Sequence, residues 1–377
     1  MIFPGPRSFT GEDCVELHLH GGRAVVAAIS RELVRQPGLR AAEAGEFTLQ
    51  AFRNGKIDLT TAEALADLID AETEAQRRFA LDNTAGRNAL LYEGWRATLM
   101  NCRALIEAEL DFPEEDDIPT SVSSQVWSTI ASLADEIARH IGEFHRSEII
   151  REGFRVAIIG PPNAGKSSLL NSLVGRDAAI VSDEPGTTRD LIEVALDLNG
   201  LKVLVTDTAG LRENAGPVER QGIARAQTAA EGADLVLMID DGSHTKGIDN
   251  PAPARPFLRV RSKIDLVAKA DSRETPECLG VSVLTGEGVE ELIEQIANRA
   301  EQATGGRSDV LPFRERHVAE LTAALAVLRE FLGMGTAPLE LAAEQLRLAS
   351  NGLGRIVGTI DVEDLLDVVF SRFCVGK

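Results

Sequence analysis

The segment 160–167 constrains this chain more than any other part of its sequence. It reads Gly-Pro-Pro-Asn-Ala-Gly-Lys-Ser and fits the pattern GxxxxGK[ST] at every position. An apolar run at 155–159 predicts a strand before it, and the pattern at 168–173 predicts a helix after it, which is the setting of a phosphate-binding loop. We expect Lys166 to reach the β- and γ-phosphates of a nucleotide and the Ser167 hydroxyl to ligate Mg²⁺.

Two further motifs follow at the spacing that such a loop requires. Asp207-Thr208-Ala209-Gly210 ends a predicted strand, where Asp207 can hold the magnesium shell and the Gly210 N–H can sense a γ-phosphate. Between this motif and the phosphate loop lies Gly-Thr-Thr-Arg-Asp at 186–190, a switch loop that would supply Thr188 to Mg²⁺. An acidic strand end alone is usually only a cap, so the order and spacing of the motifs support the functional reading.

The choice of base is predicted from Ser262-Lys263-Ile264-Asp265. The Asp265 carboxylate can accept protons from N1 and from the 2-amino group of guanine, which adenine lacks, and Lys263 can lay its methylene stem across the base. Other G proteins have Asn where this chain has Ser262, so we expect the loss of an arm that ties the loops together, and looser nucleotide binding. The segment Ser282-Val283-Leu284 resembles the loop behind the base.

The hydrolytic machinery departs from the common pattern, because Leu211 stands where many GTPases place a water-orienting Gln. Asn163, together with the switch segment 182–187, could hold a monovalent cation against the phosphates. Spacing alone leaves equally open that Asn163 merely fits the turn. Glu219 could position the attacking water, although its residue pattern by itself favours a solvated carboxylate beside Arg220.

The strand and helix patterns predict the fold class. We expect an α/β P-loop GTPase domain, with a mostly parallel sheet and helices on both faces, inserted into an all-α helical domain and preceded by a partial α+β N-terminal domain. Asn199-Gly200 signals a hairpin between two strands. The predicted strands are 155–159, 192–198, 202–206, 235–240 and 257–260. Near the N-terminus a strand is expected at 15–20 and a helix at 24–34. The predicted helical stretches are 58–110, 126–150 and 313–370, with a break at 333–338. The expected domains are 1–54 (N-terminal), 55–150 (first helical part), 151–305 (GTPase) and 306–377 (second helical part, ending in Cys-x-Gly-Lys).

Composition limits the partners and the compartment. Lys and Arg total 39 against 59 Asp and Glu, a formal charge of −20, which disfavours general binding of a phosphate backbone. If RNA is a substrate, a partner or one local patch must hold it. The four cysteines (Cys14, Cys102, Cys278 and Cys374) form no CxxC pair, and neither a signal peptide nor an apolar run of about 20 residues is evident. We therefore expect a cytoplasmic protein with reduced thiols and no membrane segment.

These motifs, the helical flanks and the terminal Phe-Cys-Val-Gly-Lys at 373–377 resemble the MnmE (TrmE) family, the tRNA wobble-uridine modification GTPases. The resemblance covers the whole chain, and residues 3–13 resemble a stretch inside the family's N-terminal domain. It implies a homodimer whose GTPase domains meet across K⁺ when GTP is bound. It also implies a heterotetramer with a flavin-dependent MnmG-type partner that carries FAD and contributes most of the tRNA contact. Together they would add a carboxymethylaminomethyl or aminomethyl group to C5 of uridine 34, with a tetrahydrofolate carrying the one-carbon unit.

The resemblance also assigns residues. Asn163, Ser182, Glu184 and Thr187 would ligate K⁺, Ser167 and Thr188 would ligate Mg²⁺, and Glu219 would be the water-positioning carboxylate beside the catalytic Lys166. Glu16, Lys56 and Lys377 would contact folate, and Cys374 would sit at the modification centre. The residues expected around GTP are Asn163, Ala164, Gly165, Lys166, Ser167, Ser168, Ser182, Asp183, Glu184, Pro185, Gly186, Thr187, Thr188, Asp207, Thr208, Ala209, Gly210, Ser262, Lys263, Ile264, Asp265, Ser282, Val283 and Leu284.

Some alternatives stay open from the residues alone. The strands and the folate-contacting arginine that begin the family's N-terminal domain have no counterpart before the segment matched by 1–13, which bears on folate binding and dimer contact. A lone cysteine such as Cys374 is most often a small buried apolar residue, and the sequence does not decide whether it is a nucleophile. The chief rival function is a regulatory RNA-binding or assembly switch without modification chemistry. A folate-binding scaffold with a vestigial GTPase is a third reading, against which intact Lys166, Asp207 and Asp265 argue.

Overall fold

The computed structural model describes residues 1–111, 122–175, 180, 192–207, 228–241, 255–266, 278–305, 310–333, 338–360, 366, 369 and 370. The chain forms two compact units, each built from separate stretches of sequence. The first comprises Met1–Asp70, Ala80–Phe144 and Val310–Lys377, and the second comprises Ala71–Phe79 and His145–Asp309. The bounds of the four domains expected from the sequence stay predictions.

A six-stranded sheet forms the centre of the second unit. Its strands lie in the order β4-β5-β3-β6-β7-β8, and every neighbouring pair is parallel except β4 with β5. The predicted hairpin is confirmed, since Leu198 pairs with Leu201 across Asn199-Gly200. Of the six strands of this sheet, the short β8 is the one that the sequence patterns missed. The strands are β3 (Phe154–Ile159), β4 (Ile192–Leu198), β5 (Leu201–Asp207), β6 (Leu235–Asp240), β7 (Phe257–Arg261) and β8 (Cys278–Gly280).

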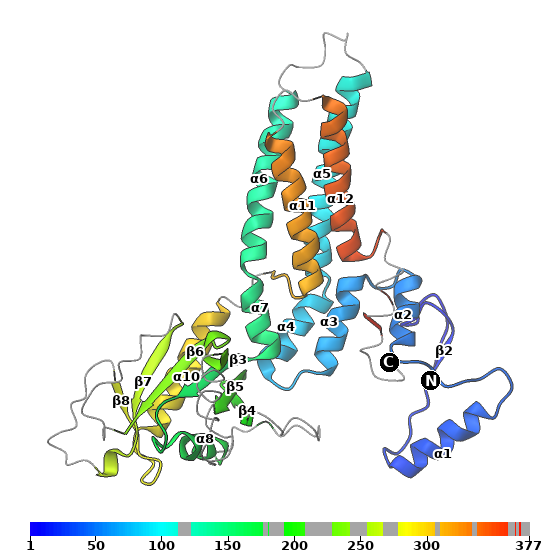
Figure 1. The fold of residues 1–377 in the computed structure, drawn as a ribbon. Coiled ribbons are helices and arrows are strands. Elements are labelled where there is room, and N and C mark those ends of the chain that lie inside the picture. The colour runs from blue at the N-terminus through cyan, green and yellow to red at the C-terminus, as the bar shows by residue number, and fades with distance from the viewer. Residues whose placement is uncertain are drawn as a thin grey trace, which may run out of the picture. The chain divides into compact units, whose positions relative to one another are not determined.

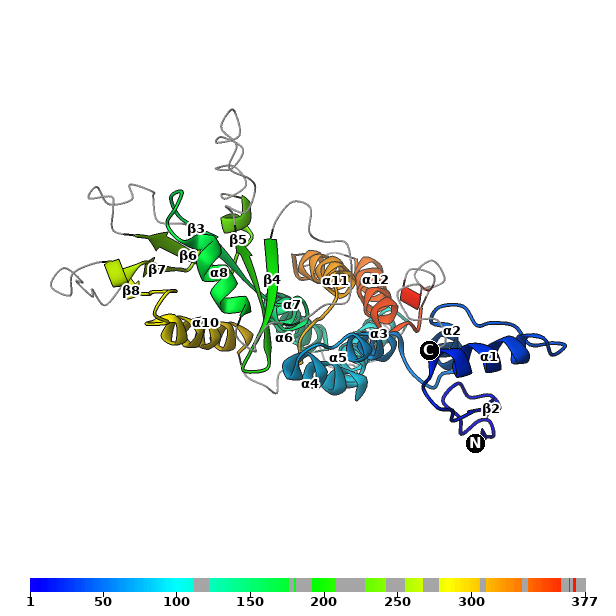
Figure 2. The ribbon, with the colours of Figure 1, turned by 90° about the horizontal axis from the view of Figure 1, so that it is seen from below.

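Alternating side chains on the central strands build one apolar layer on each face of the sheet. Val156 and Ile158 of β3 pack in the cluster that includes α8 (Lys166–Val174) and α10 (Val289–Thr304), which lie beside the sheet in Figure 2. Ala157 and Ile159 belong to a separate cluster with the helical segment 228–231. This two-faced pattern is what a mostly parallel sheet requires, and it confirms the predicted fold class.

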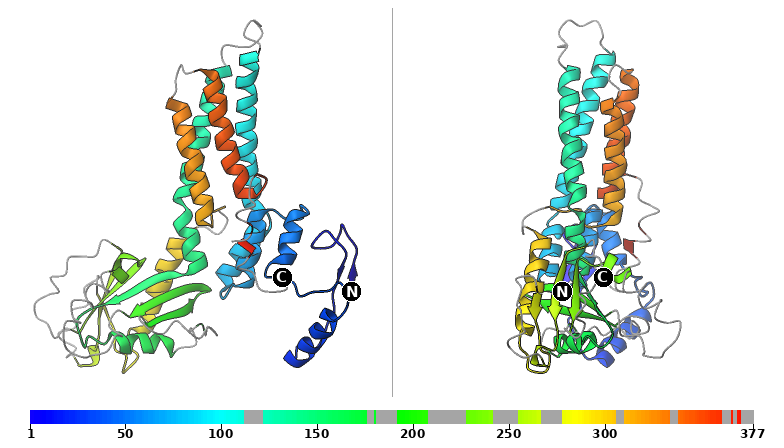
Figure 3. Two further views of the ribbon diagram at one scale, coloured as in Figure 1. Left: turned by 45° about the vertical axis from the view of Figure 1, so that its right-hand side comes forward. Right: turned by 60° about the vertical axis from the view of Figure 1, so that its left-hand side comes forward.

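Four long helices pack as a bundle in the first unit, side by side in Figures 1 and 3. Their buried residues recur every three or four positions, as on α5 at Tyr92, Trp95, Leu99, Cys102 and Ile106. Of the predicted break at 333–338, residues 334–337 lie outside the described residues; the helices on either side end at Gly333 and begin at Leu339. The bundle consists of α5 (Arg87–Asp111), α6 (Val122–Gly142), α11 (Glu315–Gly333) and α12 (Leu339–Val357).

The helical stretch predicted at 126–150 is wrong as a single element, because α6 ends at Gly142 and α7 (Phe144–Glu152) begins after Glu143. Glycine is a poor helix former, which favours the break there. The stretch predicted at 58–110 is also interrupted. It contains α3 (Leu59–Ile69), whose first turn the Asp58 carboxylate caps through the Thr61 N–H at 3.0 Å, then α4 (Glu74–Thr84) and α5.

The N-terminal residues form a small antiparallel sheet and two helices, α1 (Arg23–Val34) and α2 (Glu46–Arg53). The helix predicted at 24–34 is confirmed, but the strand predicted at 15–20 is wrong. Within the described residues, the N-terminal sheet has one ladder, which joins β1 (Ile2–Phe3) to β2 (Cys14–Val15), and no strand there pairs with the residues that follow β2. Leu17 and Leu19 are accordingly exposed. None of the helices in the described ranges is long and apolar enough to cross a membrane.

Candidate nucleotide site

The phosphate loop lies between β3 and α8, where the sequence placed it. A Cβ atom at Gly160 would stand 2.3 Å from the carbonyl oxygen of Ile239 on β6, so only glycine fits this close approach. Asn163 has a φ of 64°, a left-handed conformation that is uncommon for a residue with a side chain. Such backbone conformations are common at ligand-binding sites, where the surrounding structure holds them in place.

Lys166 begins α8 and is buried. Its ammonium donates to the carbonyl oxygens of Gly160 at 2.9 Å and of Pro161 at 2.8 Å, so the loop curls around the charge. Burial lowers the pKa of Lys166 below its usual range, and the Asp207 carboxylate opposes that shift. An ammonium held in this position by backbone carbonyl oxygens is suited to bind phosphate oxygens.

Ser167 and Asp207 meet at the carboxyl edge of the sheet. The Ser167 hydroxyl donates to the Asp207 carboxylate at 2.6 Å, and Asp207, the last residue of β5, is buried. Hydroxyl and carboxylate oxygens are hard donors of the kind that Mg²⁺ prefers in nucleotide sites. The residues present therefore fit the ion that the sequence predicted for this position.

The base-recognition loop contacts the phosphate loop directly. Lys263 follows β7 with a φ of 56°, and its ammonium donates to the carbonyl oxygen of Asn163 at 2.6 Å. The same ammonium lies 3.1 Å from the Asp241 carboxylate. Sequence reasoning missed Asp241, although a pair of acidic residues at the end of a predicted strand was a usable signal. These contacts hold the strained Lys263 backbone and place its stem beside the loop.

Ser262 corrects one expectation from the sequence. Its buried hydroxyl donates to the carbonyl oxygen of Ala164 at 2.6 Å, so the shorter side chain still ties the two loops together. The tie survives because the loops come close: a Cβ atom at Gly165 would lie only 3.7 Å from the Ser262 side chain. Whether nucleotide binding is nevertheless looser stays a prediction.

Replacing Ser262 by alanine should speed GDP release about fivefold, because one net hydrogen bond is lost and the buried Ala164 carbonyl is left without its donor. The preference for guanine over adenine should stay unchanged, since Asp265 is untouched. Stopped-flow release of a fluorescent GDP analogue measures the rate. The matched control is Ser172→Ala on α8, outside the predicted nucleotide contacts. Release equal to that of wild type and control would show that the tie has no part in binding.

Asp265 is held in place from the loop behind it. It lies in the short helical turn Ile264–Leu266, and its Oδ1 accepts a hydrogen bond from the fully buried Ser282 hydroxyl at 2.6 Å. Ser282 in turn accepts from the Thr285 N–H at 3.2 Å. The carboxylate is thus fixed in orientation before a base arrives. Of the two residues that follow Ser282, Val283 is half-buried and Leu284 is 85% exposed.

The rest of the predicted site falls partly outside the described residues. Among the described ones, Ala164 and Gly165 lie in the phosphate loop, Ser168 lies on the first turn of α8, and Ile264 lies in the turn with Asp265. Outside the described residues are Ser182, Asp183, Glu184, Pro185, Gly186, Thr187, Thr188, Thr208, Ala209, Gly210, Glu219, Cys374 and Lys377.

Two of the predicted folate contacts are described, and both are exposed. The Lys56 ammonium donates to the carbonyl oxygen of Pro6 at 2.8 Å, and Glu16 lies 3.3 Å from His18. The structure thus ties Lys56 to the N-terminal loop but gives no contact that joins it to Glu16 within the described residues. Their shared role stays a prediction.

Fold and site together define the class of the second unit, which is a P-loop GTPase domain. The family model described as the MnmE helical domain matches residues 59–374, a range that includes the second unit, and that of the GTP-binding protein TrmE N-terminus matches residues 1–56. The tRNA modification GTPase MnmE of Mesorhizobium japonicum is 55% identical over 380 residues, which cover 100% of this chain and 86% of that protein. The protein of the same name from Chelativorans sp. is 53% identical and is covered to 85%. The chain belongs to the MnmE family of tRNA modification GTPases.

Among solved structures, Aquifex aeolicus Era bound to GDP and aluminium fluoride is 25% identical over 46% of this chain and 66% of its own, with a TM-score of 0.31. That similarity is too low to add to the fold assignment.

Proposed function

We propose that this GTPase, with a flavin-dependent MnmG-type partner, installs a carboxymethylaminomethyl or aminomethyl group at C5 of the wobble uridine of tRNA. One observation carries the proposal. A guanine-nucleotide site with Lys166, the Ser167–Asp207 pair and a preset Asp265 lies in a chain related along its whole length to tRNA modification GTPases. Hydrolysis would gate the modification through dimerisation of GTPase domains, in the cytoplasm.

The phosphate loop supplies most of the proposed hydrolytic chemistry. Lys166 would stabilise charge on the β- and γ-phosphates, and the carbonyl oxygens of Gly160 and Pro161 hold the ammonium in position beforehand, without solvent reorganisation. Ser167 and Asp207 would hold Mg²⁺, directly and through its water shell, and the ion would neutralise phosphate charge. Glu219 would position the attacking water, a role that is needed because Leu211 cannot hydrogen-bond.

Potassium would replace an arginine finger in this proposal. The support is that Asn163 stands in the phosphate loop in a strained conformation, with its carbonyl oxygen already bonded to Lys263. Its side chain is exposed and thus available to a cation. Ser182, Glu184 and Thr187 would complete the ligand set, and the same ion would join two GTPase domains.

Potassium in place of sodium should raise GTP turnover about tenfold or more, because a bound cation would neutralise charge in the transition state. Asn163→Ala should abolish this rise and leave the slow rate in sodium unchanged. Phosphate release at equal ionic strength measures the effect, and Asn171→Ala on α8 is the matched control. Equal turnover of the wild-type protein in both salts would remove the cation from the mechanism.

The modification centre would lie in the first unit. An apolar cluster there brings Phe52 of α2 and Leu59 of α3 against Leu366 and Phe370. Phe52 precedes the proposed folate ligand Lys56 by four positions, and Phe370 precedes Cys374 by four. The cluster therefore joins the two stretches from which the proposed folate and thiol groups come.

A Cys374→Ser variant separates this proposal from the rival regulatory switch. Modification of tRNA with the flavin partner should fall sharply, whereas GTP turnover should match the wild type. A switch without modification chemistry would tolerate the change in both assays. The −20 charge favours the modification enzyme, because RNA-binding switches usually add a basic module.

A further inference from the structure

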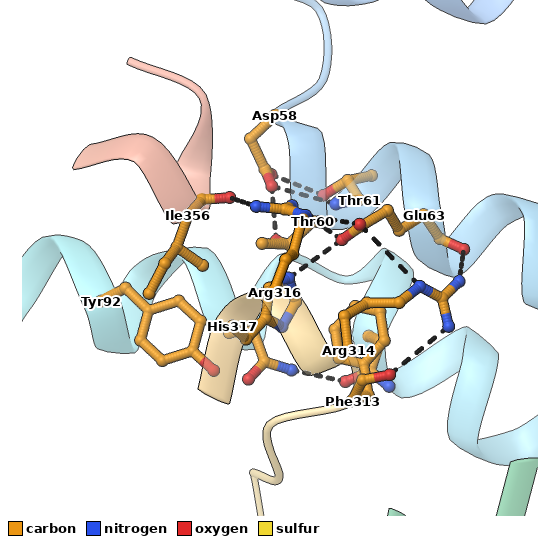
Figure 4. Close-up of polar contacts among 12 residues, drawn as sticks. Asp58, Thr60, Thr61, Glu63, Tyr92, Phe313, Arg314, Arg316, His317 and Ile356 are labelled. Carbon is orange, nitrogen blue, oxygen red and sulfur yellow. Dashed lines mark hydrogen bonds and ion pairs between the residues drawn. The ribbon is translucent and has the colours of Figure 1, made fainter. Parts of the chain in front are cut away.

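A buried charged cluster at the base of the helical bundle has no part in the chemistry above (Figure 4). Glu63 of α3 is 4% exposed, and the Arg316 guanidinium binds its carboxylate in a bidentate manner at 2.6 and 2.8 Å. His317, fully buried, lies 2.9 Å from the same carboxylate. Burial alone would raise the pKa of Glu63, but His317 and Arg316 outweigh it and hold that pKa below its usual range. Glu63 is thus a paired carboxylate at neutral pH.

The Arg316 guanidinium also contacts the end of α12. Its Nη1 donates to the carbonyl oxygen of Ile356 at 3.0 Å and faces that of Arg355 at 3.5 Å. Both carbonyls belong to the last turn of α12. Carbonyl oxygens in the last turn of a helix receive no hydrogen bond from a helical N–H, and they carry the negative end of the helix dipole. One guanidinium therefore joins α3, the start of α11 and the end of α12.

The described residues that follow α12 lie against α2 and α3 at this junction. Gly358 ends α12 with a φ of 90°, and a Cβ atom there would lie 2.7 Å from the Phe52 ring and 3.0 Å from Leu59. Further along, the Phe370 ring lies 6.3 Å from the Phe52 ring between centroids. The junction held by Arg316 is thus continuous with the apolar cluster that joins α2 and α3 to Phe370.

We propose that Arg316 and Glu63 are positioning residues for tRNA modification: they fix the end of α12 against α3, and so hold the contact between Phe52 and Phe370 near the proposed folate ligand Lys56. The inference rests on the proposed function. A buried ion pair is weak support for stability, because desolvation offsets most of the attraction. The geometry of the pair explains its presence here better, because a planar guanidinium donates to a carboxylate and to a carbonyl oxygen in fixed directions and so sets their relative position.

Arg316→Lys tests the proposal, because lysine keeps the charge but cannot hold both Glu63 oxygens and the Ile356 carbonyl in one plane. We expect the kcat of tRNA modification with the flavin partner to fall about tenfold or more, as small misplacements of reacting groups do, with the KM for tRNA unchanged. GTP turnover should stay within about twofold of wild type. The matched control is Arg347→Lys, which alters an exposed bidentate pair with Glu344 on α12.

Amide hydrogen exchange supplies a second readout that does not depend on modification. Exchange should quicken in Arg316→Lys at α2, α3 and the segment around Phe370, and not in the control. Glu63→Gln, a milder change, should give the same pattern if Arg316→Lys folds poorly. Unchanged kcat and unchanged amide exchange would overturn the proposal. A fall in kcat that is fully explained by a lower melting temperature in both variants would also overturn it. A wild-type protein that modifies no tRNA would instead contradict the proposed function.

Discussion

Lys166→Ala is expected to lower GTP turnover by about 10²–10³-fold, the usual cost of removing one preorganised group that stabilises transition-state charge. The ammonium is buried and already bonded to the carbonyl oxygens of Gly160 and Pro161. No other lysine or arginine within the described residues contacts those two carbonyls. Phosphate release under single-turnover conditions, with the protein in excess over GTP and at a saturating concentration, measures the chemical step separately from nucleotide binding.

The matched control for this variant is Lys202→Ala. Lys202 is also a lysine of the second unit, but its ammonium pairs with Glu72 away from the phosphate loop. Its removal should leave turnover within about twofold of wild type, because the ion pair that is lost lies away from the nucleotide site. A Lys166→Ala protein that melts like the wild type and hydrolyses GTP at a similar rate would refute the assigned role of the loop.

Asp265→Asn is expected to weaken GDP and GTP binding by about 10²-fold or more. A carboxylate can accept both guanine N–H groups. In asparagine an NH2 group replaces one of the two oxygens and faces a guanine N–H donor to donor. The bonds to a negative charge are lost as well, and each such bond contributes about 1.5–3 kcal/mol. The Ser282 hydroxyl fixes the side chain, so the mismatch cannot be relieved by a simple rotation. Xanthine nucleotides, which carry a carbonyl in place of the 2-amino group, should gain affinity.

Competition against a labelled guanine nucleotide measures this change in base preference. Asp197→Asn is the control, because Asp197 only accepts from the Gly200 N–H in the β4–β5 turn and asparagine keeps that acceptor. In the wild type, GTP and GDP should displace the label and ATP should not. Displacement by ATP as effective as that by GTP would contradict the assignment of the base-recognition loop.

Local patterns in the sequence predicted the parts of the fold that depend on neighbouring residues. The phosphate loop, the Asn199-Gly200 hairpin and the strand 235–240 follow from spacing within one short stretch, and the structure has them there. β8 escaped because it has only three residues and no apolar run of its own. The strand expected at 15–20 failed for the opposite reason: its alternation is local, but the partner strand that it needs is absent from the described fold.

Contacts between distant residues could not be predicted in this way. Ser262 lies 98 positions from Ala164, and the sequence gives no measure of how closely their loops approach. Glu63 and Arg316 are 253 positions apart, and the local sequence around each predicts only an ordinary charged residue at the surface. Their pairing, and the burial of Glu63, follow only from the fold, which brings α3 to the start of α11. The roles of individual site residues, Glu219 and Cys374 among them, remain predictions.

Mass spectrometry of tRNA nucleosides tests the central claim most directly. Cells that lack this chain should lose the carboxymethylaminomethyl or aminomethyl group of the wobble uridine. The wild-type chain should restore it, and Lys166→Ala, expressed to the same level, should not. A wobble uridine that keeps its modification without this chain, or that Lys166→Ala restores fully, would contradict a GTP-driven modification enzyme.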